Sequence, residues 1–234
     1  MPDDAELERL DPADLLDQEA ARLDRYFTDL PASRWHLPSR CPGWSIRDVL
    51  AHLTAVEAYH HACLASQVKA FEREVEARGG TDLATANELG IAELADRTPE
   101  QLLQRWRADD ATTRRGFRDR GDGRVDTSVG DYPSRWQAFH VAGELAVHAD
   151  DVFVTIAAEE REARRDWRAR FSRFVLAEYK PELVVRVEGD RTRVQGEGCD
   201  VLVDDDELIE GVAGRLDAAS RLDPAERRLL NAMP

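Results

Sequence analysis

The sequence predicts a mainly α-helical protein: a four-helix bundle over residues 1–160, a linking helix over 161–180 and a small C-terminal α/β domain over 181–234. Apolar residues recur at spacings of three and four in long segments before about residue 160, which is the period of helices packed in a bundle. After about residue 180 the pattern changes to the alternation typical of strands. With 234 residues and 42% hydrophobic content, the chain can bury a sizeable core.

The first helix is predicted to begin in the stretch LDPADLL, where Asp11 can act as the N-cap and Pro12 suits the first helical position. The apolar residues that follow lie on one face of this helix: Leu16, Ala20, Leu23, Phe27 and Leu30. Their spacing of four and three indicates a bundle seam.

The second helix is predicted to follow the proline-containing loop LPSRCPGW. Ser45 and Asp48 resemble a capping box, with aspartate in place of the usual glutamate or glutamine. The apolar pattern then runs from Val49 as far as Val75, and the Gly79-Gly80 pair ends it. We therefore expect one long helix over this range.

Two further helices are expected before the last bundle helix. A short one is predicted between residues 85 and 96. The stretch TPEQLLQRW predicts the start of a longer one, with Thr98 as its cap and Pro99 at its first position. The region from 121 to 130 contains several glycines, so we expect a loop there.

The last bundle helix is expected to begin near Pro133 or Ser134 and to run to about Ala158. It contains the stretch HVAGELAVHADD, which places Glu144 and His148 one turn apart on the same face among apolar residues. No basic residue in this stretch can neutralise the carboxylate, and burying an unpaired carboxylate costs several kcal/mol or raises its pKa. Glu144 therefore needs a partner.

The C-terminal part begins with a charged helix around Trp167. The stretch LVVRVEGDRTRVQGEG contains two alternating segments around a Gly189-Asp190 turn, which predicts a β-hairpin. The stretch CDVLVDDDELIEGVAGRL then predicts a third strand followed by a helix. The acidic run from Asp204 to Glu207 is compatible with a metal site, but acidic residues also favour a helix N-terminus, and we prefer that interpretation.

Composition narrows the class of protein. The formal charge of −15 repels phosphate backbones, and no uninterrupted basic patch offsets it, so we do not expect nucleic-acid binding. No segment approaches the roughly 18 apolar residues that a membrane span needs. Cys41, Cys63 and Cys199 are odd in number and lack a CxxC spacing, which predicts free thiols and no thiolate zinc site. We expect a soluble, cytoplasmic protein without a membrane partner.

The possible partners of Glu144 are the histidines: His36, His52, His60, His61, His140 and His148. His52 lies near the edge of the apolar seam of the second helix, whereas we expect His60 and His61 to face solvent in part and His140 to complete the stripe of Glu144. Two imidazoles and one carboxylate are the usual ligands of a catalytic zinc, and they also suit ferrous iron or nickel. The residues alone leave a second interpretation open, in which Glu144 and His148 are a hydrogen-bonded structural pair and His52 is a core-edge histidine.

Two segments resemble a known family. CPGWSIRDVLAHLTAVE contains the pattern GW-x-x-x-D-x-x-x-H, and GELAVHADD contains E-x-x-x-H-x-x-D. Both patterns resemble the metal-ligand segments of the mycothiol-dependent maleylpyruvate isomerase family, whose N-terminal domain belongs to the DinB-like bundle superfamily. The resemblance covers approximately residues 8–158, and it implies that His52, Glu144 and His148 are metal ligands in a DinB-like four-helix bundle.

The resemblance also implies a function. Members of this family use a low-molecular-weight thiol, typically mycothiol, so we expect a divalent metal, with zinc as the first choice, that activates mycothiol. The thiol would be transferred to a small electrophilic substrate or would drive its cis-trans isomerisation. A metal-dependent hydrolase on the same site and a non-enzymatic regulatory or binding bundle are the alternatives. The sequence identifies neither the electrophile nor the oligomeric state.

Other residues near the two segments have open roles. Asp151 could orient an imidazole as a hydrogen-bond acceptor, or it could face solvent. Cys41 precedes Pro42 in the loop before the second helix, where a catalytic thiol is a minor possibility. Arg215 and Arg221 are unassigned candidates for binding a substrate carboxylate.

Overall fold

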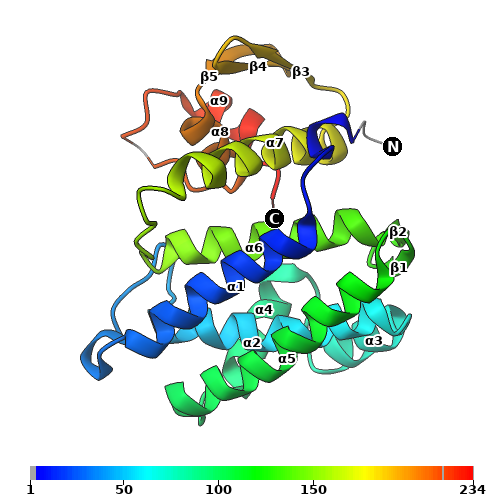
Figure 1. Cartoon of the computed structure of the whole chain (residues 1–234), viewed down its shortest axis with the longest axis vertical. Helices are drawn as coiled ribbons and strands as arrows, with labels where there is room; N and C mark the ends of the chain where they lie inside the picture. The colour runs from blue at the N-terminus through cyan, green and yellow to red at the C-terminus, as the bar shows by residue number, and fades with distance from the viewer. Residues whose placement is uncertain (1–3, 218, 234) are drawn as a thin grey trace. The chain divides into compact units, whose positions relative to one another are not determined.

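The computed structural model describes residues 4–217 and 219–233 and divides the chain into two compact units. The bundle unit consists of Asp11–Val154, and the terminal unit combines Met1–Leu10 with Thr155–Pro234. The protein is mainly helical with small antiparallel sheets, which confirms the predicted fold class (Figure 1). The outermost parts of the predicted ranges 1–160 and 181–234, residues 1–3 and 234, lie outside the described residues, as does residue 218.

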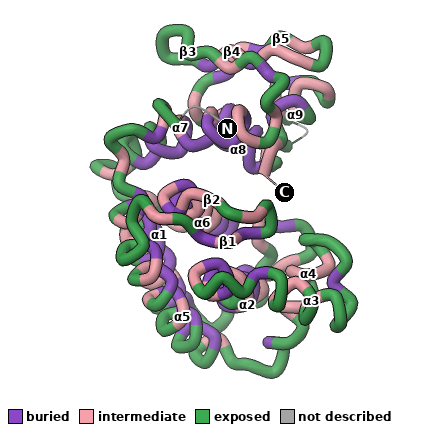
Figure 2. Tube along the Cα trace, turned by 90° about the vertical axis from the view of Figure 1, so that its right-hand side faces the viewer, coloured by how far each residue is buried: buried purple, intermediate pink, exposed green. Residues whose placement is uncertain are grey.

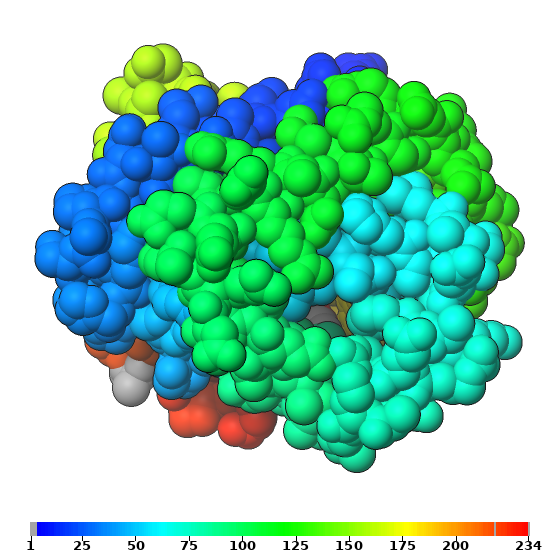
Figure 3. Space-filling view, turned by 90° about the horizontal axis from the view of Figure 1, so that it is seen from below, coloured from blue at the N-terminus to red at the C-terminus, as the bar shows by residue number. Residues whose placement is uncertain are grey.

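Helices make up most of the bundle unit. Its elements in chain order are α1 (Pro12–Asp29), the 3-10 helix η2 (Ala32–Arg34), α2 (Ile46–Leu64), α3 (Val68–Ala77), α4 (Leu83–Glu93), α5 (Pro99–Arg120), β1 (Arg124–Thr127), β2 (Gly130–Pro133) and α6 (Ser134–Asp151). The bundle is formed by α1, α2, α5 and α6, the four long helices of this unit in Figure 1. Helices α3 to α5 contribute to the face of the unit seen in Figure 3.

The four bundle helices are not equally close. Helix α1 packs against α5 and α6, and α2 packs against α5, whereas the backbones of α2 and α6 approach each other less closely. Buried residues recur along these helices, separated by exposed ones (Figure 2). The wider spacing between α2 and α6 leaves room for polar side chains from both helices, and this is where the candidate site lies.

Side-chain caps fix where three of the four bundle helices begin, α1, α2 and α5, as predicted. Asp11 accepts hydrogen bonds from two backbone amides at the start of α1, with Pro12 in the first turn. Ser45 and Asp48 form a reciprocal capping box at the start of α2, and Thr98 forms another with the third residue of α5. These caps satisfy backbone N–H groups that have no partner within the helix.

The prediction of one long second helix was wrong. Helix α2 ends at Leu64, and α3 begins at Val68. Ser66 takes the left-handed conformation with φ 56°, and the amide of Gln67 donates to the carbonyl of Ala62 over 2.8 Å. This is the backbone pattern of a Schellman C-cap, which usually contains glycine. A serine occupies that position here, so the sequence carried no stop signal.

The last bundle helix is shorter than predicted for the same reason. Helix α6 ends at Asp151 rather than near Ala158. Phe153 has φ 66°, and the amide of Val154 donates to the carbonyl of Ala149 over 2.9 Å, which closes the helix in the same way.

The region from 121 to 130, which was predicted to be a loop, contains strand β1 and the first residue of strand β2. Strands β1 and β2 pair there as an antiparallel hairpin, in which Val125 lies opposite Tyr132 and Thr127 opposite Gly130. Helix α4, Leu83–Glu93, lies close to the short helix predicted between 85 and 96.

The terminal unit joins helices to a three-stranded antiparallel sheet. Its elements are the 3-10 helix η1 (Ala5–Leu7), α7 (Arg161–Tyr179), β3 (Val184–Glu188), β4 (Arg191–Gly196), β5 (Cys199–Val203), α8 (Asp205–Val212) and α9 (Pro224–Leu230). The predicted hairpin is confirmed: Glu188 pairs with Arg191 across the turn, where Gly189 has φ 66°. Asp204 and Glu207 form the capping box of α8, so the acidic run is a helix start.

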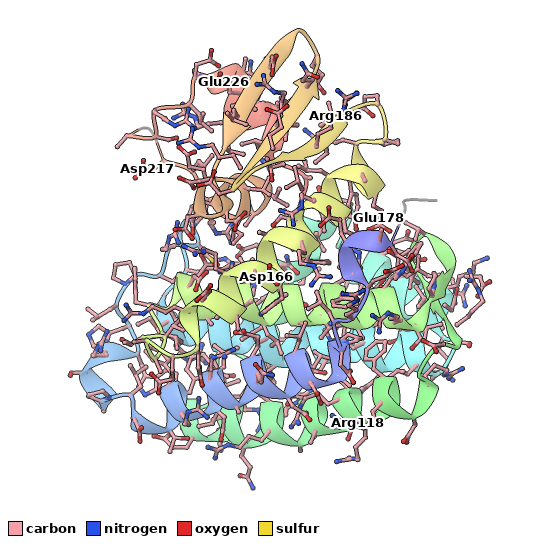
Figure 4. The ribbon with its side chains drawn as sticks, turned by 45° about the horizontal axis from the view of Figure 1, so that its top comes forward. Arg118, Asp166, Glu178, Arg186, Asp217 and Glu226 are labelled. Atoms are coloured by element: carbon pink, nitrogen blue, oxygen red, sulfur yellow. The ribbon has the colours of Figure 1, made fainter. Side chains whose placement is uncertain are left out.

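Charged side chains cover the outside of both units. Figure 4 shows Arg118 on α5, where it donates to Asp17 of α1 over 2.6 Å, and Glu226 on α9. Among the described residues, no helix combines the length and the apolar character needed to cross a membrane.

Replacing a core leucine should reveal the contribution of packing to the bundle. Leu50 of α2 is fully buried, so Leu50→Ala should lower the free energy of unfolding by about 2–5 kcal/mol. Leu83→Ala is the matched control, because Leu83 is 51% exposed and its loss should change stability by less than about 0.5 kcal/mol. Urea unfolding followed by helical circular dichroism measures both. Equal stability of the two variants would contradict the core position of Leu50.

Candidate metal centre

The structure brings His52, Glu144 and His148 together inside the bundle unit. His52 lies in the second turn of α2, and Glu144 and His148 lie one turn apart on α6. One potential ligand atom from each of the three residues lies within 4.8 Å of the other two. Both histidines are buried, and Glu144 is half-buried.

Glu144 is paired with two imidazoles of α2. Its Oε1 lies 3.2 Å from Nε2 of His52, and its Oε2 lies 3.4 Å from Nε2 of His60. Burial raises the pKa of Glu144, but the hydrogen bonds and positive charge from these histidines outweigh that effect and hold the pKa below its usual range. The carboxylate that the sequence left without a partner is therefore compensated across the bundle.

The expectation that His60 faces solvent in part was wrong. His60 is only 3% exposed and lies between Glu144 and Glu57, whose Oε2 is 3.6 Å from Nδ1 of the imidazole. Burial lowers the pKa of His60, but the two carboxylates raise it to about 10, so the imidazole is a cation at neutral pH. The sequence does carry a signal for this burial, because His52 and His60 are eight residues apart and so lie two turns apart on nearly one face of the helix.

His148 is held on one side by a carboxylate. Its Nδ1 lies 3.1 Å from Oδ2 of Asp151, which is fully buried and so does not face solvent. The thiol of Cys41 donates to the same Oδ2 over 3.1 Å. Because Asp151 occupies the Nδ1 side, Nε2 is the nitrogen of His148 that remains to bind a metal.

The loop before α2 carries Cys41 to this position. The amide of Arg40 donates to the carbonyl of Asp151 over 3.0 Å, and Pro38 and Ser45 form an isolated antiparallel bridge that closes the loop. Trp44, at the end of the same loop, lies against His52 with 5.1 Å between ring centroids. The loop therefore contacts both α2 and α6 at the site.

A second group of residues also has the chemistry to bind a metal. Cys41, His148 and Asp151 are all buried and place one ligand atom each within 4.8 Å of the others. His148 belongs to both groups. In the second group the nearby ring nitrogen is Nδ1, which lies 3.1 Å from Asp151 and 3.8 Å from the sulfur of Cys41. From the sequence, Cys41 was predicted to be a free thiol with a possible catalytic role, and its proximity to His148 and Asp151 was not predicted.

The first group fits a divalent metal. A tetrahedral zinc with ligand distances of about 2.0–2.2 Å separates neighbouring ligand atoms by roughly 3.3–3.6 Å. The 3.2 Å between His52 Nε2 and Glu144 Oε1 is close to that separation. Two neutral imidazoles and one carboxylate would also leave one position open for a thiol, water or substrate.

The other histidines considered as partners of Glu144 have contacts elsewhere or lie at the surface. His61 Nε2 lies 3.1 Å from the carbonyl oxygen of Asp109, and His140 Nε2 lies 3.3 Å from the hydroxyl of Tyr132. His36 is exposed.

The two arginines proposed for a substrate carboxylate, Arg215 and Arg221, belong to the terminal unit. Within that unit Arg215 donates to the carbonyl of Ala213, and Arg221 pairs with Glu207 over 2.6 Å.

A helical bundle that gathers two imidazoles and a carboxylate between two of its helices defines the class: a bundle protein with a candidate metal centre. The family model described as "Mycothiol maleylpyruvate isomerase N-terminal domain" matches residues 16–153, and the chain belongs to this family, a family of enzymes. The match contains both segments that carry the candidate ligands.

Two solved structures have the same fold. A crystal structure of the mycothiol-dependent maleylpyruvate isomerase is 13% identical, with a TM-score of 0.66 over 88% of this chain and 89% of that chain. A crystal structure of the H52A mutant of the mycothiol-dependent maleylpyruvate isomerase is 17% identical, with a TM-score of 0.50 over 72% of this chain and 68% of that chain. No curated protein matches the sequence.

The charge of His60 predicts how stability depends on pH in the metal-free protein. Because the folded state raises the pKa of His60 from about 6.5 to about 10, its stabilisation is complete below pH 6.5 and is lost as the pH rises through 10. The free energy of unfolding should therefore fall over this range more steeply in the wild type than in His60→Gln. His61→Gln, the neighbouring control, should keep the wild-type slope. Parallel curves for wild type and His60→Gln would contradict a charged His60.

Proposed function

We propose that this protein is a metal-dependent enzyme that activates mycothiol, or a related low-molecular-weight thiol, for reaction with a small electrophilic substrate. The observation that carries the proposal is the convergence of His52, Glu144 and His148 between α2 and α6. Family membership supports the thiol, since the matching model is named for a mycothiol-dependent isomerase. Both the metal-ligand assignment and the cytoplasmic location expected for such an enzyme are parts of the proposal.

The chain's own residues bind and orient the reactants in this account. His52 and His148 contribute neutral nitrogens and Glu144 contributes Oε1, so the bound ion keeps net positive charge. A divalent metal at this position supplies a Lewis acid that favours the thiolate, the nucleophilic form of a thiol. Asp151 accepts from Nδ1 of His148 and so fixes which nitrogen of that imidazole faces the site.

The mycothiol thiolate is the nucleophile in the proposed reaction. It adds to an electrophilic carbon of a substrate double bond, so that the π bond breaks and its electron pair moves onto the neighbouring electron-withdrawing group. Protonation of this anion by solvent gives the product of thiol transfer. If the thiolate leaves instead, after rotation about the resulting single bond, the double bond re-forms and the net result is cis-trans isomerisation. Cys41 does not serve as the nucleophile in this account, because its buried thiol donates to Asp151.

Loss of a ligand should remove the metal. We expect about one zinc ion per chain in the loaded wild type and a small fraction of that in His52→Ala and His148→Ala. His140→Ala is the matched control, because His140 lies on α6 but contacts Tyr132 instead of the site. Elemental analysis after dialysis measures the content. Unchanged metal in both ligand variants would refute the assignment.

Thiol dependence tests the chemistry. Because binding to the metal favours the thiolate, titration with mycothiol should release about one proton per site near neutral pH. Glu144→Gln should lose metal binding and thiol-dependent turnover of a panel of electrophiles together, whereas Cys41→Ser should keep most of the turnover. Bacillithiol and glutathione serve as control thiols. Equal turnover with and without thiol would make the site a water-activating hydrolase instead.

A further inference from the structure

We infer that His60, supported by Glu57, is a positioning residue that holds Glu144 as a one-oxygen metal ligand. This inference rests on the proposed metal site. A carboxylate can bind a metal through one or both oxygens, and the choice depends on what else contacts it. In this protein each oxygen of Glu144 faces a different imidazole.

The two oxygens have different surroundings. Oε1 lies 3.2 Å from Nε2 of His52, a candidate ligand, so this oxygen faces the site. Oε2 lies 3.4 Å from Nε2 of His60, which belongs to neither of the two groups that could hold a metal. A hydrogen bond from His60 to Oε2 would keep that oxygen directed away from the ion.

His60 is itself held in place. It is 3% exposed, and on its far side Glu57 is 2% exposed with Oε2 3.6 Å from Nδ1 of His60. That distance is too long for a hydrogen bond, and Nδ1 has no hydrogen-bond partner among the described residues, so Glu57 acts on the ring by charge. Thr113 of α5 donates to the same oxygen of Glu57. The row of contacts runs from α6 through α2 to α5.

The matched variants differ by one methylene. In His60→Gln the side-chain amide extends as far as Nε2 of histidine and can still donate to Glu144, whereas in His60→Asn it ends near Nδ1, on the side of Glu57. His60→Ala removes both contacts. His61→Ala is the control, because His61 is the adjacent histidine and contacts the backbone of Asp109 instead.

Zinc affinity, measured by competition with a chromophoric chelator, is the direct readout. Removing a group that orients a ligand typically weakens metal binding 10–100-fold. We expect a loss of about that size in His60→Ala and His60→Asn, and at most about a threefold change in His60→Gln and His61→Ala. The visible spectrum of the Co²⁺-substituted protein should change in His60→Asn, because Glu144 can then bring both oxygens to the ion, and stay like wild type in His60→Gln.

Each result has one consequence. Equal zinc affinity and equal Co²⁺ spectra in His60→Gln and His60→Asn would overturn the positioning role, even if His60→Ala fails to fold. A wild type that binds zinc no more tightly than His52→Ala would overturn the proposed metal site itself, and the positioning role with it. Weak zinc binding in His60→Asn and His60→Ala, with wild-type binding in His60→Gln, supports both the positioning role of His60 and the proposed metal site.

Discussion

A carboxylate inside a helical bundle is the constraint on which this site depends. Glu144 projects from α6 toward α2, and a buried carboxylate without a partner would be expensive or would take up a proton. His52 and His60, two turns apart on α2, each contact one of its oxygens. The same arrangement that keeps Glu144 ionised presents one oxygen to the position between His52 and His148, so charge compensation and ligand geometry have a common origin.

The surrounding fold maintains this arrangement through both of the helices that carry the site. The capping box of Ser45 and Asp48 fixes the start of α2, and with it the position of His52 along the bundle. On the other helix, α6 ends at Asp151, whose side chain holds His148 and whose carbonyl receives the amide of Arg40. The loop that carries Cys41 and the end of α6 therefore support each other across the site.

Local signals in the sequence predicted much of the fold and the three candidate ligands. Caps such as Asp11 and Thr98 act within one turn, so they can be recognised without a structure, and family resemblance selected His52 to pair with Glu144 and His148. The interruption at Ser66 could not be predicted, because a serine in the left-handed conformation leaves no mark in the pattern. The spacing of His52 and His60 on one helix indicates that both can face the core. It does not reveal the role of His60, because that role depends on a contact with Glu144, 84 residues further along the chain and on another helix.

X-ray absorption at the zinc edge of the loaded, thiol-free protein tests the central claim most directly. The account predicts a first shell of nitrogen and oxygen atoms only, at about 2.0–2.2 Å, from two imidazoles and the Glu144 carboxylate. A sulfur atom at about 2.3 Å would contradict it, since this would place the ion on Cys41, His148 and Asp151 instead.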